Sequence, residues 1–278
     1  QPVTTSKADI KANTQPQSMN TAPANSNWSG YDFAPGELVI FADNQAKAKN
    51  GEFPNDFRLL KGSAEYTDLG NEKAVSFLGI PTEIAPKMKT EAFLPQVFTV
   101  EFDAYFHNLP GESYVLRFKG MRDIEANINS VTMGDFNGYT TDNLSKPAWR
   151  HIAVVFNPQG MKMYIDQFRV VNIPKVDVKP SSFTIYANNE GAKTGDRAMI
   201  RNFRLFDASV IPEDRLRADG KIVSHGITFA PGSPDLNPEG AGTLNMIAEL
   251  MKSDPDMKLS IEVHIDKTGA PSGDLQIL

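Results

Sequence analysis

Residues 149–170 read WRHIAVVFNPQGMKMYIDQFRV, and this stretch decides the fold class. Residues 150–156 are nearly all apolar, which is typical of a central strand that is covered on both faces. The turn signals of residues 157–160 (NPQG) follow, and residues 161–165 then alternate between apolar and polar side chains. The stretch therefore predicts a β-hairpin in the interior of a sheet.

A second strand is predicted at residues 97–106 (VFTVEFDAYF), which alternate strictly. One face of this strand is apolar and consists of Phe98, Val100, Phe102, Ala104 and Phe106. Shorter β-type runs follow at residues 183–187 and 199–206, and no convincing amphipathic helix interrupts residues 28–207. Many short strands at roughly even spacing favour an antiparallel β-sandwich.

The composition excludes several function classes. The net charge of −6 argues against a nucleic-acid-binding surface, because such surfaces are normally basic. No run approaches the eighteen or so apolar residues of a membrane helix, so we expect no membrane-spanning segment. The absence of cysteine removes disulfides and cysteine-ligated metals, and the four histidines show no ligand spacing.

Changes in composition divide the chain into four parts. Residues 1–27 are rich in Gln, Thr, Asn, Ser, Pro and Ala, which predicts a flexible N-terminal tether. Residues 28–209 form the predicted sandwich, residues 210–220 a charged connector or short helix, and residues 221–278 a smaller unit. The chain begins at Gln1, which a cleaved signal peptide or a fragment boundary would both explain.

The smaller unit predicts a strand, a helix and a second strand. Residues 222–229 (IVSHGITF) and 258–264 are the strands, and Asn237-Pro-Glu opens the helix with a capping Asn and a Pro at the first helical position. An apolar helix stripe is expected from Leu244, Ile247, Ala248 and Met251. This order indicates half of an α+β domain.

Residues 226–266 (GITFAPGSPDLNPEGAGTLNMIAELMKSDPDMKLSIEVHID) resemble the start of the OmpA-like peptidoglycan-binding domain family. The matching positions are Ile227, Phe229, Ser233, Pro238 with Leu244, Pro255-Asp256 and Val263-His264-Ile265-Asp266. The resemblance implies that the peptidoglycan stem peptide is the partner. It also implies a partial α+β OmpA-like domain in a bacterial cell envelope, in the periplasm or at the outer membrane.

The same resemblance implies a site for diaminopimelate. Asp266 would bind the ammonium group, with His264 in the same loop and Asp274 where many members carry a loop Asn. Two features depart from the family. Val263 and Ile265 replace its usual Gly and Thr, and the Leu-Ser-x-x-Arg-Ala motif, whose Arg clamps the ligand carboxylate, does not occur before Leu278.

The larger unit is similar to laminin-G/concanavalin A-like jelly rolls. Residues 149–170 resemble their Trp-x-His…Tyr-Ile-Asp-Gly hairpin, and residues 199–207 (MIRNFRLFD) resemble their closing strand. Residues 30–43 and 51–57 resemble the opening of the sandwich that precedes OmpA-like domains in Bacteroidetes-type envelope proteins. The implied fold class is a concanavalin A-like antiparallel β-sandwich.

The glycosidases of this class carry Glu-x-Asp-x-x-Glu on one strand. Glu101 and Asp103 begin this pattern, but Phe106 stands where the third carboxyl is needed. We therefore predict a solvated polar face rather than a catalytic site. His151, which follows Trp149 in the central strand, is predicted to be a packed core residue.

Calcium is the one metal for which candidates exist. Asp135, Asn137 and Asp142 lie in an oxygen-rich loop, but their spacing lacks the Gly of the regular calcium loop, which favours a solvated turn. No cofactor is otherwise predicted.

Two functions remain open. The first is a non-enzymatic envelope protein that tethers the outer membrane or periplasmic assemblies to peptidoglycan, with the sandwich as spacer or as a module that recognises a glycan or an envelope protein. The alternative is a carbohydrate-binding, lectin-like module, with the OmpA-like part serving only for localisation.

Overall fold

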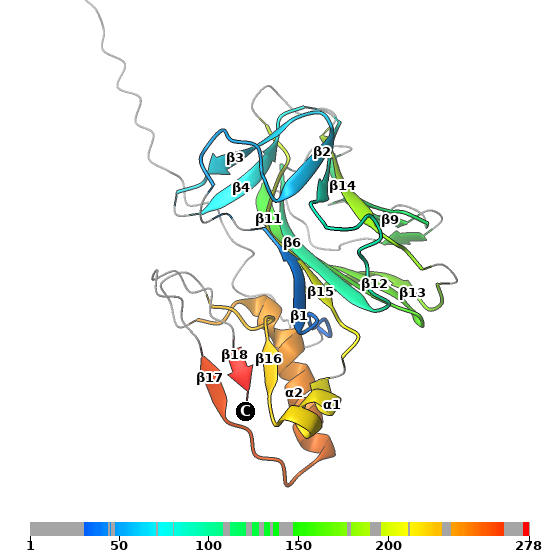
Figure 1. Cartoon of the computed structure of the whole chain (residues 1–278), viewed down its shortest axis with the longest axis vertical. Coiled ribbons are helices and arrows are strands. Elements are labelled where there is room, and N and C mark those ends of the chain that lie inside the picture. The colour runs from blue at the N-terminus through cyan, green and yellow to red at the C-terminus, as the bar shows by residue number, and fades with distance from the viewer. Residues whose placement is uncertain are drawn as a thin grey trace, which may run out of the picture.

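The computed structural model places two large sheets face to face, with a smaller unit below them in the view of Figure 1. It describes residues 31–43, 45, 48–70, 72–79, 81–107, 112–120, 124–127, 131–133, 136–138, 147–176, 179–189, 196–210, 212–229, 235–263 and 275–277. The candidate tether, residues 1–27, lies outside the described residues.

The first large sheet, sheet A, has eight strands in the described part of the chain. They are β1 (Leu38–Ala42), β3 (Ala64–Asp68), β4 (Lys73–Phe77), β6 (Phe98–Phe106), β11 (Ala148–Asn157), β12 (Gly160–Ile165), β13 (Phe168–Ile173) and β15 (Met199–Asp207). Their order is β13-β12-β11-β6-β15-β4-β3, with β1 pairing with β15. All of these pairings are antiparallel.

The second large sheet, sheet B, has seven strands among the described residues. They are β2 (Phe57–Lys61), β5 (Thr82–Pro86), β7 (Glu112–Phe118), β8 (Ile124–Asn127), β9 (Val131–Met133), β10 (Phe136–Gly138) and β14 (Phe183–Asn189). Their order is β10-β9-β8-β7-β14-β5-β2, again with antiparallel pairing throughout. The chain is therefore mainly β, with antiparallel sheets.

The predicted hairpin is formed by β11 and β12. Asn157 pairs with Gly160 across a two-residue turn, and the Gln159 backbone N–H donates to Asn157 Oδ1 at 2.9 Å. β11 also pairs with β6, so that it lies inside sheet A as the apolar run indicates. The prediction of an interior hairpin is confirmed.

The core between the two sheets contains the predicted apolar face of β6. Phe98 is stacked on Phe156 of β11 with 5.0 Å between ring centroids, and Phe102 lies 5.5 Å from Phe203 of β15. A bulge in β15, with Asn202 at φ 54°, accompanies the turn of Phe203 into this core. Aromatic burial of this kind contributes most of the stabilisation of a sandwich.

The other face of β6 is buried at Thr99 and Glu101 and partly buried at Asp103 and Tyr105, so the predicted solvated polar face is wrong. Thr99 is 1% exposed and Glu101 is 2% exposed. The cause is the segment of residues 31–37, which crosses this face of sheet A. It packs Tyr31 and Phe33 against Ala153 and Tyr164, and the Gly36 N–H donates to Thr99 Oγ1 at 2.9 Å.

The smaller unit follows β15. It consists of α1 (Pro212–Asp219), β16 (Ile222–Ser224), the 3₁₀ turn η3 (Pro238–Gly240), α2 (Ala241–Ser253), β17 (Ile261–Val263) and β18 (Leu275–Ile277). Among the described residues these strands form a third sheet, sheet C, in the order β16-β18-β17. Both outer strands are antiparallel to β18, so β16 and β17 run parallel to each other. No described helix is long and apolar enough to cross a membrane.

The predicted stripe of α2 is largely wrong. Ile247 is buried, but Leu244 and Met251 are 39% and 41% exposed, and Ala248 is exposed. The buried residues are Gly242, Thr243, Ile247 and Leu250. On this side, Gly242 contacts the 31–37 segment of the sandwich, and Ile247 packs on Ile227 of the smaller unit.

Contacts at the start of α2 show this docking. Gly242 lies so close to Phe33 that a Cβ would be 1.6 Å from the Phe33 carbonyl oxygen, and Asn245 Nδ2 donates to the Tyr31 carbonyl at 3.1 Å. Pro238 occupies the first position of η3, as predicted, but Asn237 does not cap the turn. Its Nδ2 donates instead to Thr228 Oγ1 at 2.8 Å.

Candidate functional site

The residues that the OmpA-like resemblance indicates lie outside the described residues. These are His264, Asp266 and Asp274. The last described residue before them is Val263, at the end of β17. Whether these three side chains form a site therefore stays a prediction.

The calcium candidates fall mostly outside the described part of the chain as well. Asp135 and Asp142 are not described, and Asn137 lies in β10, where it pairs with Thr132. Among the described residues, no group of three or more His, Asp or Glu side chains is arranged to hold a metal ion.

A hollow of about 460 Å³ lies at the β2–β5–β14–β7 part of sheet B, and we call it the sheet B hollow. Arg58 pairs with Ala85, Thr184 pairs with Arg117, and the β5–β14 register brings the two pairs into one row across four strands. Three strand spacings separate the two arginines at the backbone, which is roughly 14 Å. Two small residues therefore lie between two guanidinium side chains.

A fixed polar network lies at one end of this row. Arg117 Nη1 donates to Glu83 Oε2 at 3.0 Å, and Thr184 Oγ1 donates to Glu83 Oε1 at 2.5 Å. The Arg117 guanidinium also stacks on Tyr186, 3.9 Å from the ring centroid. Stacking and a charge-assisted hydrogen bond together hold both the guanidinium and the carboxylate in place.

The segment that follows β5 forms one wall of the hollow. Phe93 packs on Phe183 with 5.5 Å between ring centroids, and the Leu94 N–H donates to the Ser181 carbonyl at 3.1 Å. The end of β7 is tied to the same place, because the Lys119 N–H donates to the Ser182 carbonyl at 2.9 Å. Backbone hydrogen bonds thus fix the wall as well as the floor.

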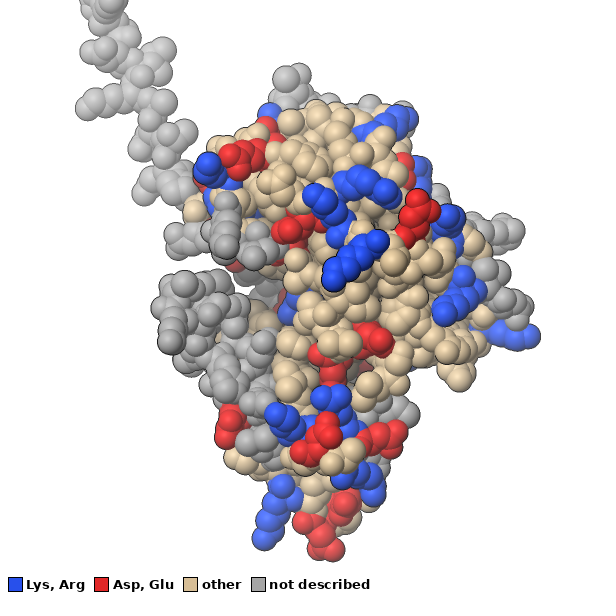
Figure 2. Space-filling view, in the orientation of Figure 1, with Lys and Arg blue, Asp and Glu red and all other residues tan. Residues whose placement is uncertain are grey.

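The charge at the hollow is opposite to that of the chain. Its lining includes five cations, Arg58, Lys87, Lys89, Arg117 and Lys119, and one carboxylate, Glu91, whereas the whole chain carries a net charge of −6. Figure 2 shows Lys and Arg gathered on this face over β2 and β14. Glu91 does form an ion pair with Lys119 at 3.9 Å, but both side chains are largely exposed, so it contributes little.

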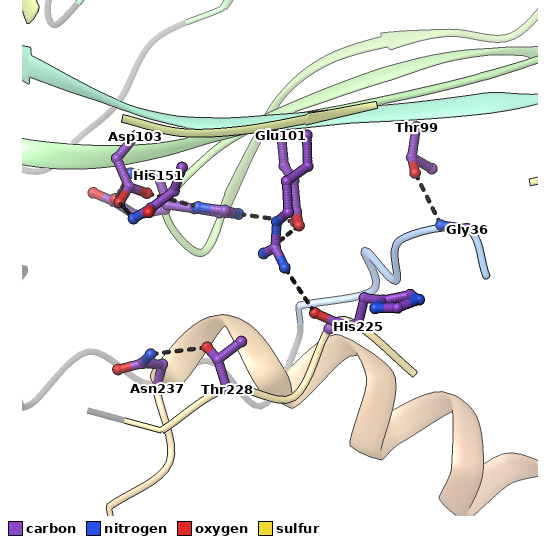
Figure 3. A network of polar contacts seen from close by, with 12 residues as sticks. Gly36, Thr99, Glu101, Asp103, His151, His225, Thr228 and Asn237 are labelled. Atoms are coloured by element: carbon purple, nitrogen blue, oxygen red, sulfur yellow. Dashed lines mark hydrogen bonds and ion pairs between the residues drawn. The ribbon is translucent and has the colours of Figure 1, made fainter. Parts of the chain in front are cut away.

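A second polar cluster lies on the buried outer face of sheet A (Figure 3). Asp103 accepts hydrogen bonds from His151 Nδ1 at 3.1 Å, Arg201 Nε at 3.1 Å and Asn202 Nδ2 at 2.8 Å. Glu101 Oε1 forms an ion pair with Arg204 Nη2 at 2.5 Å. His151 is buried as predicted, but its partners are charged rather than apolar.

The smaller unit covers this cluster. Arg204 Nη1 donates to the His225 carbonyl at 3.1 Å, which joins β15 to the chain after β16. Burial alone would raise the pKa of Asp103, but the hydrogen bond and charge of His151 and the charge of Arg201 lower it to about 2. Burial alone would lower the pKa of His151, but Asp103, Glu239 and Glu101 raise it to about 9.

The two polar regions differ in how accessible they are to solvent. The carboxylates that the sequence singled out, Glu101 and Asp103, are paired and covered, whereas the sheet B hollow is open. Sequence reasoning missed the hollow because Arg58, Ala85, Arg117 and Thr184 come from four separate strands. No spacing within one strand could have found them.

The sequence matches no known family, and no curated protein matches it either. Among solved structures, the chain is similar to domain 4 of AbnA, an extracellular arabinanase from Geobacillus stearothermophilus, in complex with arabinotriose (11% identity, TM-score 0.44, 65% of this chain and 96% of that one). It is similar to the carbohydrate-binding module CBM66 from Bacillus subtilis (15% identity, TM-score 0.38, 55% of this chain and 96% of that one). It also resembles the binding domain of botulinum neurotoxin DC in complex with SialylT (14% identity, TM-score 0.42, 63% of this chain), about half of whose length it spans (49%).

Proposed function

We propose that the β-sandwich is a non-enzymatic carbohydrate-binding domain and that the sheet B hollow is its binding site. The observation that carries this proposal is that Arg117 and Thr184, which line the open hollow, are held in place by hydrogen bonds to Glu83, which lies outside the lining. A sugar hydroxyl both donates and accepts hydrogen bonds. The lining offers the Arg117 guanidinium as a donor and the Thr184 hydroxyl on the neighbouring strand, and that combination suits vicinal hydroxyls.

The size of the hollow supports the same function. A volume of about 460 Å³ lies within the range of small-ligand sites. The small side chains of Ala85 and Thr184 leave the floor open between Arg58 and Arg117. Because the groups are already held in place, binding would require little ordering of side chains.

A glycan array probed with the full chain tests this function, followed by titration of the best saccharide. Arg117→Met keeps an unbranched side chain but removes the guanidinium, with its donors and its stacking on Tyr186, and we expect its Kd to rise at least tenfold. Lys221→Met, a change at the exposed residue before β16, is the control and is expected to bind normally. Thermal unfolding of both variants separates a lost contact from a lost fold. The proposal fails if the array retains nothing, or if Arg117→Met binds like the wild type.

Peptidoglycan tethering in a bacterial cell envelope is the second candidate function. The observation that favours it is the arrangement of the smaller unit, in which β16 and β17 are parallel, lie on either side of β18, and are joined through α2. A pull-down on purified peptidoglycan with wild type and Asp266→Ala tests this role. Equal retention of the two proteins, or none, would count against Asp266 as the ligand of diaminopimelate.

A further inference from the structure

The cations around the sheet B hollow point to the class of sugar. Resting on the proposed carbohydrate function, we infer that the ligand is an acidic saccharide whose carboxylate binds at the Arg58 and Lys87 side of the hollow. Five cations line the hollow against one carboxylate, in a chain that is acidic as a whole. A neutral sugar gains little from this charge, whereas a sugar acid gains charge-assisted hydrogen bonds.

The positions of the charges orient the ligand. Glu83 lies beside Arg117 and Thr184, so this end of the row already holds a negative charge that is paired with a cation. A second carboxylate would be repelled there. Arg58 lies at the other end, on the edge strand β2, and it is exposed. The carboxylate of the sugar is therefore directed to Arg58, and its hydroxyls to Thr184 and Arg117.

Backbone geometry brings Lys87 to the same end. The Lys87 N–H donates to the Asp56 carbonyl at 2.8 Å, which ties the residue after β5 to the residue before β2. Arg58 and Lys87 thus belong to neighbouring strand ends. A planar guanidinium can bind a carboxylate with two parallel hydrogen bonds, and the ammonium adds a further positive charge.

The same network distinguishes a sugar acid from a compact inorganic anion. Phosphate or sulfate bound at Arg58 and Lys87 would leave Arg117 and Thr184 without a ligand, because roughly 14 Å separate the two arginines at the backbone. A sugar ring separates its carboxylate from its hydroxyls, and so it can satisfy both ends of the row at once.

Isothermal titration of the full chain with matched pairs tests the inference. The probes are trigalacturonate against its carboxyl-reduced counterpart, and sialyllactose against lactose, with the glycan array as the wider survey. We expect at least one acidic member to bind at least tenfold more tightly than its neutral partner, a difference of about 1.4 kcal/mol. Arg58→Gln should abolish this preference, whereas the exposed control Lys221→Gln should keep it.

The outcomes separate the inference from the function on which it rests. If the acidic and neutral members bind equally and Arg58→Gln changes neither, the inference is wrong and the carbohydrate function stands. If inorganic phosphate displaces the acidic sugar at equal concentration, the site is a general anion site and the inference is also wrong. If no saccharide on the array binds, the proposed function itself fails.

Discussion

The contact between α2 and the 31–37 segment makes Gly242→Ala a sharp perturbation. A Cβ at this position would lie 1.6 Å from the Phe33 carbonyl oxygen, 2.6 Å from its carbon and 3.1 Å from its nitrogen. All three are backbone atoms, so no side chain can rotate away. To reach an ordinary contact of about 3.5 Å, the helix and the segment must separate by roughly 2 Å.

Two opposing energies determine how much Gly242→Ala changes the free energy of unfolding. Alanine in place of glycine inside a helix stabilises it by up to about 1 kcal/mol. Overpacking of this kind costs about 1–3 kcal/mol, and a shift of this size also breaks the 3.1 Å hydrogen bond from Asn245 to Tyr31, which contributes about 1 kcal/mol. The net expectation is a loss of roughly 2 kcal/mol in the free energy of unfolding, accompanied by local opening of residues 31–37.

Urea denaturation and amide hydrogen exchange measure these two effects. The Gly36 amide, which donates to Thr99, should exchange faster in Gly242→Ala. Gly240→Ala is the matched control, because a Cβ there meets its nearest atom at 3.5 Å, an ordinary contact. If Gly242→Ala proves as stable as the wild type and the Gly36 amide stays protected, α2 is not seated on this segment and the docking described above is wrong.

Two further predictions concern the sandwich. The raised pKa of His151, about 9, supplies stability that is complete below about pH 6.5 and is lost as the pH rises through 9. The lowered pKa of Asp103, about 2, supplies stability that is present above about pH 3.9 and is lost as the pH falls towards 2. Asp103→Asn should therefore lower the free energy of unfolding by about 3 kcal/mol near neutral pH and reduce its loss at alkaline pH. Urea titration across pH measures both effects. If the alkaline loss is unchanged, Glu101 and Glu239, and not Asp103, stabilise the charge of His151. Gly62→Ala should lower Tm more than Gly51→Ala. Both glycines have a positive φ, +75° and +81°, but a Cβ added at Gly62 would lie 2.3 Å from Thr82 Oγ1, whereas Gly51 has open space around it. Equal losses of Tm would rule out an effect of the Thr82 contact.

Much of the fold could be predicted from the sequence because it rests on local patterns. The hairpin of β11 and β12 follows from an apolar run, a turn and an alternating run that are contiguous in the chain. The core face of β6 follows from strict alternation, because successive side chains of a β-strand point to opposite faces of the sheet. The order of strand, helix and strand in the smaller unit was predicted for the same reason.

Burial of the second face of β6 could not be predicted, because it depends on residues far away in the sequence. Thr99 is covered by Gly36, and the polar cluster is joined to His225 through Arg204. A strand with polar residues on one face has the same sequence pattern whether that face contacts water or is covered by another segment of the chain. The prediction of the α2 stripe failed for the same reason, because the buried side of this helix depends on contacts with Phe33 and Ile227, which are distant in the sequence.

The two polar regions of the sandwich show why a sequence motif is a weaker guide to function than the solvent accessibility of its residues. Glu101 and Asp103 begin a known catalytic pattern, yet each is held by buried or half-buried cations, and opening their site would expose at least two ion pairs and the packed Tyr31. The sheet B hollow has no motif, because a row across four antiparallel strands draws single residues from distant parts of the chain. Arg117 is nevertheless fixed by its contacts with Glu83 and Tyr186, and its side chain stays 37% exposed. A ligand could bind the second arrangement without opening the structure, and for that reason we propose recognition on sheet B. The sheet A cluster connects the sandwich to the smaller unit through Arg204 and His225.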